Sequence, residues 1–208
     1  MRIVCLGASG ATGRQLVTAA LNRGHHVVAV VRRPEVLDGL AHGNLSVRQG
    51  DVQQPSTIAS ACEGADGVIS TLGFSRGGPW NILSAGARAV LDARPQRVVW
   101  MGSFGVGVSR YKGGRLYDLV LRFALKDGFD DKALADQLIA GPTTTIVHPT
   151  VLTNAERDTH PTTVTPLDEL PKSWHFIPPR VSRRAVAAAM LDEFAEARYQ
   201  GRVVVVSC

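Results

Sequence analysis

The chain has 208 residues, of which 45% are hydrophobic and 20% are charged, and its formal net charge is +5. This length and composition are typical of a soluble globular protein with one domain over residues 1–208, and no apolar stretch is long enough to span a membrane. The basic residues are scattered without a long Lys or Arg run, which argues against a nucleic-acid partner.

Apolar runs typical of strands alternate with helical patterns along the whole chain. Strands are predicted at residues 2–6, 27–31, 45–49, 67–71, 97–101, 144–148 and 202–207. Helices are predicted near residues 11–23, 55–63, 79–93, 115–139 and 182–197. Continuous apolar strands between helices indicate a parallel sheet that is covered on both faces. The predicted fold is therefore an α/β, doubly wound parallel sheet.

Residues 153–180 differ from the rest because they are rich in proline and show little periodicity. We expect a small irregular C-terminal substrate region there, which lies as a lid over the carboxyl edge of the sheet. Ligands bind along this edge in doubly wound folds.

The first predicted strand runs directly into three glycines spaced three apart, and a helix follows. Gly7 allows the chain to reverse, Gly10 lets a pyrophosphate approach the backbone, and Gly13 lets the helix pack close to the strand. The pyrophosphate would bind the N–H groups at the helix N-terminus. The predicted contacts are Gly7, Ser9, Gly10, Ala11, Thr12 and Gly13.

The end of the second predicted strand indicates which nicotinamide cofactor is bound. NAD sites usually carry an Asp or Glu there, which holds the ribose 2′-hydroxyl. Here Arg32 and Arg33 stand in its place, and Arg14 follows the third glycine. Arginine suits a 2′-phosphate, so NADP (NADPH) is favoured over NAD. The alternative is that Arg32 and Arg33 are solvated loop residues.

Two further segments fit a cofactor cleft. Asp51 and Val52 follow the third strand, and Thr71, Leu72 and Gly73 end the fourth. Asp51 can hold the adenine amino group, or it can cap the helix near residue 55. A glycine at position 73 lets the backbone approach the cofactor ribose.

Seven short motifs stand in one order along the chain, and together they resemble the atypical short-chain dehydrogenases/reductases that bind NAD(P)H. The resemblance is to the biliverdin-IXβ reductase/flavin reductase group and its NmrA-like relatives. It implies a Rossmann fold with a small C-terminal substrate region, and NADPH-dependent reduction of flavins, linear tetrapyrroles or quinones. The motifs occupy residues 7–14, 31–34, 50–52, 70–73, 97–103, 145–150 and 181–187.

The resemblance also implies residues of a catalytic site. Ser103 matches the family's serine after strand five, where it would hydrogen-bond the carboxamide or the acceptor, unless it only stabilises a turn. Lys132 matches the lysine of the family's Tyr-x-x-x-Lys motif and would bind the ribose, unless it is a solvated helix residue. The backbone after strand six would meet the nicotinamide, at Pro149, Thr150, Val151 and Leu152.

The tyrosine of that motif is missing. Its position is occupied by Gly128, and no Tyr-x-x-x-Lys occurs anywhere in the sequence. Alcohol oxidation and epimerisation need a positioned acid or base, whereas an electron-poor conjugated acceptor can take its proton from water. The sequence therefore favours a conjugated acceptor. His148 can serve as a proton donor, but such a histidine is more often structural, and it is left outside the predicted catalytic set.

Residues 103–115 form a glycine-rich, basic loop that is expected to border the acceptor pocket. Together with Trp80, its Phe104 and Tyr111 would offer aromatic faces to a planar acceptor. The alternative is a flexible loop that serves no substrate.

These observations favour an NADPH-dependent reductase of a flavin, quinone or tetrapyrrole-like acceptor. An NADP-binding redox sensor without turnover and a biosynthetic ketoreductase remain alternatives. We expect a cytoplasmic monomer or homodimer with no nucleic-acid or membrane partner. Cys5, Cys62 and Cys208 are predicted to be reduced thiols, and no metal site is expected.

Overall fold

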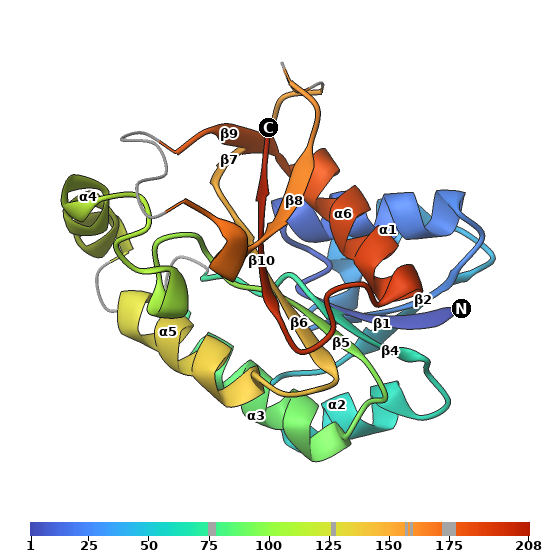
Figure 1. The fold of residues 1–208 in the computed structure, drawn as a ribbon. Coiled ribbons are helices and arrows are strands. Elements are labelled where there is room, and N and C mark those ends of the chain that lie inside the picture. The colour runs from blue at the N-terminus through green and yellow to red at the C-terminus, as the bar shows by residue number, and fades with distance from the viewer. Residues whose placement is uncertain (75–77, 126–127, 157, 159, 172–177) are drawn as a thin grey trace.

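The structure is a computed structural model that describes residues 1–74, 78–125, 128–156, 158, 160–171 and 178–208. Its centre is an eight-stranded sheet in the order β3-β2-β1-β4-β5-β6-β10-β8 (Figure 1). Every pairing in this sheet is parallel except that of β8 with β10. The strands are β1 (Arg2–Leu6), β2 (His26–Val31), β3 (Leu45–Gln49), β4 (Gly67–Ser70), β5 (Val98–Met101), β6 (Thr144–Pro149), β8 (Thr163–Pro166) and β10 (Val203–Ser207).

The central strands are apolar because helices cover the sheet on both faces. Residues 67–70 and 98–101 are buried along the whole of β4 and β5, and residues 204–207 of β10 are buried as well. β-branched residues such as the valines of β10 pack well on a pleated, fully covered surface. The predicted doubly wound parallel sheet is confirmed.

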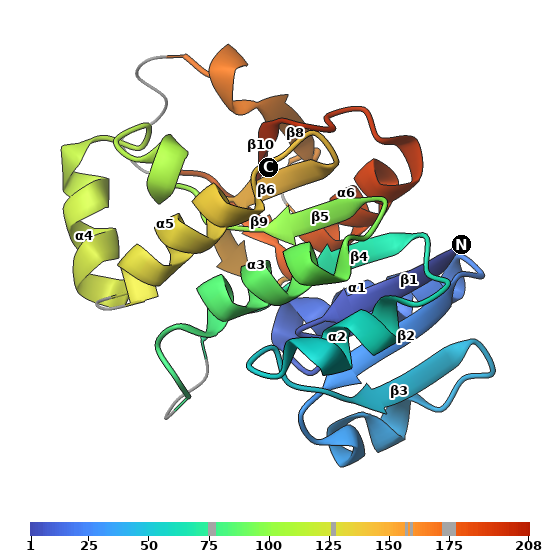
Figure 2. The ribbon, with the colours of Figure 1, turned by 90° about the horizontal axis from the view of Figure 1, so that it is seen from below.

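The helices divide into two layers (Figure 2). On one face α1 (Ala11–Asn22) packs against α6 (Arg183–Glu196), and their apolar sides form one core cluster with the sheet. On the other face α3 (Ile82–Ala93) lies between α2 (Pro55–Cys62) and α5 (Gly128–Ile139), over a second core cluster that includes Trp100. The sheet is thus covered on both sides, as its composition predicts.

Two segments differ from the prediction. The helix expected over 115–139 is described as two helices, α4 (Arg115–Leu125) and α5, and α4 stands away from the sheet (Figure 1). The region 153–180 is less irregular than expected, because β8 hydrogen-bonds along β10 and extends the sheet. A second, two-stranded sheet pairs β7 (Val151–Thr153) with β9 (Arg180–Ser182). Residues 157, 159 and 172–177 of this region lie outside the described residues.

The order of the strands across the sheet changes direction at β1. From β1 the chain adds β2 and β3 on one side, and it then adds β4 and β5 on the other side. The loops after β1 and β4 therefore lead to opposite faces of the sheet and leave a crevice at its carboxyl edge.

Within the described part of the chain, no helix combines the length and the apolar character that crossing a membrane requires.

Candidate functional site

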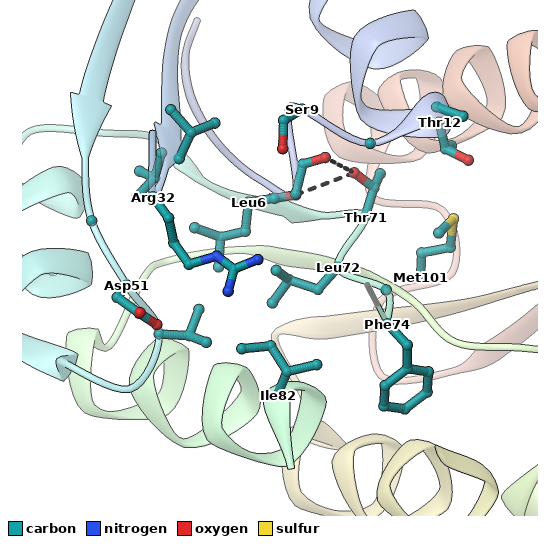
Figure 3. A pocket seen from close by; sticks show the side chains of 18 of the residues that line it. Leu6, Ser9, Thr12, Arg32, Asp51, Thr71, Leu72, Phe74, Ile82 and Met101 are labelled. Carbon is teal, nitrogen blue, oxygen red and sulfur yellow. Dashed lines mark hydrogen bonds between the residues drawn. The ribbon is translucent and has the colours of Figure 1, made fainter. Parts of the chain in front are cut away.

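A cavity of about 370 Å³ lies at the carboxyl ends of β1, β2 and β4 (Figure 3). This volume is within the range of roughly 300–1,000 Å³ that is typical of small-molecule sites. The cavity is elongated. Arg32 and Asp51 line one end, and Phe74 and Met101 line the other (Figure 3).

The turn after β1 forms one wall of the cavity, and its shape depends on glycine. Gly7 has φ +76°, which L side chains rarely adopt. A Cβ at Gly7 would lie 2.7 Å from the carbonyl carbon of Thr71. The Thr71 hydroxyl donates to the Leu6 carbonyl at 3.2 Å, so the turns after β1 and β4 are held together at the crevice.

The first turn of α1 is packed directly on this glycine turn. A Cβ at Gly13 would lie 2.0 Å from the Gly7 carbonyl oxygen, so no side chain fits there. Gly10 is the N-cap of α1 and lines the cavity, as do Ala11 and Thr12. Because Gly10 carries no side chain, it cannot cap the first N–H groups of the helix. These groups suit an anion such as a pyrophosphate.

The arginines that favoured NADP have different positions. Arg32 lines the cavity, and its guanidinium extends into it (Figure 3). Arg33 is exposed, begins the short 3₁₀ helix Pro34–Leu40 and does not line the cavity. Arg14 donates to the carbonyl oxygens of Ser9 and Val36, at 3.3 and 2.6 Å. Arg14 therefore joins the glycine turn to the segment after β2, and it does not line the cavity.

Asp51 lines the cavity but does not cap α2, the other role that its sequence position left open. Its side chain is on the cavity wall beside Arg32. One of its carboxylate oxygens also accepts the Gln53 backbone N–H at 3.0 Å, and its backbone N–H donates to the Thr57 hydroxyl at 3.1 Å. These bonds order the loop that leads into α2, whose N-cap is Gln54 rather than Asp51.

At the opposite end, the ring of Phe74 lies directly against the backbone of α5. A Cβ at Gly128 would be 2.7 Å from Phe74 Cε2, so even an alanine there would displace the ring. The Lys132 ammonium lies 6.0 Å from the centre of the same ring. Phe74 thus fills the space in front of Gly128, where the family resemblance would place a tyrosine.

The two predicted catalytic residues lie near this end, but neither lines the cavity. Burial lowers the pKa of Lys132, while the carboxylates of Asp136 and Asp131 act in the opposite direction. Ser103 follows β5 by two residues, and its carbonyl accepts the Val106 N–H at 3.2 Å in a tight turn. Neither side chain lies on the cavity wall, although Lys132 faces the Phe74 ring and Ser103 follows the wall residue Met101 by two positions.

A buried polar network supports the turn that carries Ser103. His148 Nε2 lies 2.9 Å from Asp136 Oδ2, and His148 Nδ1 lies 2.8 Å from the Ser109 hydroxyl. His148 has no exposed surface, so it is a structural residue with both ring nitrogens engaged. A Cβ at Gly102 would come within 2.7 Å of both Asp136 and His148. This network was not predicted, although its three residues lie in segments that the sequence singled out.

The remaining wall is formed by residues from the C-terminal half of the chain. Leu152 of β7 and Arg183 at the start of α6 both line the cavity. Arg183 donates to the Asn154 side-chain oxygen at 2.7 Å, which fixes its guanidinium at the site. Thr150 is buried and directs its N–H and its hydroxyl to the Val206 carbonyl, away from the cavity.

The structure thus brings most of the predicted cofactor residues together. The cavity wall includes Gly7, Ser9, Gly10, Ala11, Thr12, Arg32, Asp51, Val52, Thr71, Leu72, Gly73 and Leu152. The predicted residues outside the wall are Gly13, Arg14, Arg33, Ser103, Lys132, Pro149, Thr150 and Val151. Their roles toward a cofactor stay predictions.

Several wall residues were missed by the sequence analysis. Phe74 directly follows the predicted Gly73, and Arg183 belongs to the motif at 181–187, so both had a signal. The aromatic faces expected near the loop 103–115 are not on the wall. Phe104 is fully buried, and Trp80 and Tyr111 are exposed to solvent. The expectation that Phe104 offers a face to the acceptor is wrong, because its ring packs in the interior.

Among the residues that the structure describes, no group of three or more His, Cys, Asp or Glu side chains is arranged to hold a metal ion. The chemistry available at the cavity is therefore built from backbone N–H groups, two arginines, one carboxylate, hydroxyls and apolar side chains. Such a set suits a phosphate-bearing ligand with a flat apolar end.

Comparison with known proteins also indicates an NAD(P)H-binding protein. A profile of the NAD(P)H-binding family matches residues 7–197. A 3β-hydroxysteroid dehydrogenase/Δ5→4-isomerase of Mycobacterium tuberculosis is 32% identical over 125 residues, which is 50% of this chain and 32% of that protein. The photosystem II assembly factor Ycf39 of Synechocystis is 35% identical over 69 residues, 33% of this chain and 21% of its own. The chain spans about a third or less of these relatives.

Solved structures share the fold over the whole chain. ChuY, an anaerobilin reductase from Escherichia coli O157:H7, has a TM-score of 0.77 at 23% identity, with 100% of this chain and 97% of that chain covered. A short-chain dehydrogenase/reductase from Veillonella parvula in complex with NADP has a TM-score of 0.73 at 19% identity, with 100% and 94% covered. At these identities the likeness establishes the Rossmann-like α/β fold alone.

Proposed function

This chain belongs to the NAD(P)H-binding family, and we propose that it is an NADPH-dependent reductase that transfers hydride to a planar conjugated acceptor, such as a flavin, a quinone or a tetrapyrrole. The family match supports an oxidoreductase-like protein with a nicotinamide cofactor. The choice of NADPH and the class of acceptor are the proposal.

The observation that carries the proposal is the packing of Phe74 on Gly128. The ring fills the space that a proton-donating side chain at position 128 would need, and the Lys132 ammonium faces a ring instead of a hydroxyl. Reduction of a ketone needs a positioned acid, whereas reduction of an electron-poor conjugated ring depends mainly on holding donor and acceptor in contact. A flat apolar wall serves the second task.

The cofactor would bind along the elongated cavity. The N–H groups at the start of α1 would hold the pyrophosphate. The Arg32 guanidinium would bind the 2′-phosphate, because it extends into the cavity next to Asp51. The nicotinamide would then lie at the end formed by Phe74 and Met101. When bound, NADPH supplies the hydride.

No described side chain on the cavity wall is well placed to supply the proton in place of a tyrosine. His148 is fully buried, and Tyr111 is exposed away from the wall. Solvent would protonate a reduced flavin or quinone, which needs little help because its charge is delocalised. Lys132 would act on the ribose and on the electrostatics of the site rather than on proton transfer.

Steady-state oxidation of NADPH with FMN and with a soluble benzoquinone tests the proposal, and the anaerobilin reductase neighbour adds biliverdin to the panel. We expect turnover with at least one planar acceptor, and none after Gly10→Val, which obstructs the cavity. NADPH binding in calorimetry without turnover on any acceptor would contradict the reductase proposal and favour a redox sensor.

A further inference from the structure

Helix α4 presents an apolar stripe to solvent. Its inner side is engaged with the protein, because Asp118 accepts from Arg110 Nε at 2.8 Å and the Tyr117 ring lies 6.1 Å from that of Phe104. Its outer side carries Leu116, Leu119, Val120 and Phe123, whose exposed fractions are 54%, 64%, 55% and 81%. A helix in a globular protein normally turns its apolar side inward, so the outer side calls for a partner.

The four residues form one continuous surface. Their spacing of three, one and three residues places them on one side of an 11-residue helix. In both ribbon views α4 projects from the body of the protein next to the start of α5 (Figure 2). The stripe is therefore accessible to a large flat partner.

Basic residues border the stripe. Arg115 and Arg122 are exposed on α4, and Lys112 precedes the helix. Of the acidic residues nearby, Asp118 is paired with Arg110, and Asp130 at the start of α5 is near the same arginine. The Arg122 guanidinium lies 5.5 Å from the centre of the Phe129 ring, at the junction of α4 and α5. The charges next to the stripe are thus predominantly positive.

We propose that α4 is a membrane-surface helix that binds an anionic bilayer. Its leucines, valine and phenylalanine would enter the boundary between headgroups and acyl chains, while the arginines would contact lipid phosphates. A short helix with an apolar side and basic borders lies in the plane of a membrane and does not cross it. Anionic headgroups attract juxtamembrane Lys and Arg residues.

A second copy of the chain fits this surface less well. A stable dimer buries roughly 800 Å² per partner over about 20–30 residues, which is more than one 11-residue helix provides. A two-fold interface centred on the stripe would also bring the basic borders of the two copies close together, and like charges at an interface are unfavourable.

We expected no membrane partner because the sequence has no membrane-spanning stretch, but a helix that lies on the membrane surface needs none. Binding through α4 would bring acceptors dissolved in lipid to the carboxyl edge of the sheet. This consequence rests on the proposed function, whereas binding of the helix to vesicles does not.

Sedimentation with vesicles tests the proposal. The intact protein is mixed with vesicles of phosphatidylcholine alone, or of equal parts phosphatidylcholine and phosphatidylglycerol, at low and high salt. We expect binding to the anionic vesicles, with weaker binding in high salt. Leu119→Gln with Phe123→Gln should lower the partition coefficient about tenfold or more, and Arg115→Gln with Arg122→Gln should remove most of the preference for anionic lipid.

Leu91→Gln on α3 is the matched control, since Leu91 is an exposed leucine on another helix, and it should bind vesicles like the wild type. All the substituted positions are exposed, and circular dichroism and NADPH binding establish that the variants are folded. Wild-type protein that stays in the supernatant with anionic vesicles would overturn the proposal. So would a wild-type dimer in light scattering that the Leu119/Phe123 variant converts to a monomer.

Discussion

The two ends of the cavity are built in different ways. At the glycine end, backbone packs on backbone, and a Cβ at Gly13 would lie 2.0 Å from the Gly7 oxygen. At the other end, a side chain forms the wall, because the half-buried Phe74 ring leans on Gly128. At the first end, the backbone itself leaves no room for a side chain at Gly7 or Gly13. The second can be remodelled by a single substitution, and a buried network supports the neighbouring turn.

The largest effect should come from breaking that buried network. Asp136→Ala removes the partner of His148 Nε2 and leaves an imidazole without exposed surface partly unpaired. We expect the free energy of unfolding to fall by about 1–3 kcal/mol, the cost of leaving a buried polar group unsatisfied, in urea titrations. Ser109→Ala, at the other end of the network, should cost a similar amount, because it leaves His148 Nδ1 and the Gly105 N–H without their partner. Equal stability of Asp136→Ala and the wild type would mean that the network does not hold this end.

The glycine end should be the most sensitive part for ligand binding. Gly10→Val places a branched side chain on the cavity wall, where its Cβ meets only the Gly7 oxygen at 3.2 Å, so the fold should survive. NADPH affinity in calorimetry should fall about a hundredfold, comparable to losing one or two hydrogen bonds to a charged group. Gly43→Val is the control, because a Cβ there meets nothing within 4 Å. Normal NADPH binding by a folded Gly10→Val variant would disprove the phosphate site.

Cofactor preference separates the two arginines after β2. Arg32 lines the cavity and Arg33 does not. Arg32→Ala should therefore reduce the preference for NADPH over NADH by about tenfold to a hundredfold, the value of one charge-assisted contact. Arg33→Ala should reduce it less. If the wild type binds both cofactors equally, Arg32 does not read the 2′-phosphate.

The acceptor end should respond most gently. Phe74→Ala removes the flat wall, and we expect the KM for FMN to rise about tenfold, within the range of aromatic stacking and its apolar contact. NADPH affinity should stay within about twofold, since aromatic stacking is local to this end. Trp80→Ala is the control, because Trp80 is exposed beside Phe74 and lies off the wall. An unchanged KM in steady-state assays would exclude Phe74 from acceptor binding.

The glycine end could be predicted because its residues are consecutive. Strand, turn and helix follow one another between residues 2 and 22, and the geometry of Gly7 and Gly13 is what the spacing indicates. Arg32 and Asp51 follow strands whose order the topology fixes. Local pattern and parallel pairing were sufficient there.

The end of the cavity lined by Phe74 and Met101 could not be predicted in the same way, because it is assembled by contacts over long sequence distances. Phe74 comes from the β4 end, Gly128 from α5 and His148 from β6. Their packing leaves no periodic signal. The sequence analysis expected one helix over 115–139, whereas the structure describes α4 and α5 separately and turns the apolar stripe of α4 to solvent. The short strand β8 was missed because its pairing with β10, rather than its own pattern, makes it a strand.

Our central claim is that the Phe74 ring, packed on Gly128, takes the place of a proton donor. The ratio of kcat/KM for planar acceptors to kcat/KM for alcohols tests this claim most directly. The same preparation is assayed for NADPH-dependent reduction of FMN and a benzoquinone, and for NADP-dependent oxidation of secondary alcohols across a range of pH. We predict that kcat/KM for the planar acceptors exceeds that for the alcohols by more than about a hundredfold, the lower end of what general acid–base catalysis contributes. Robust alcohol oxidation with a pH profile that reports one essential base would contradict the account.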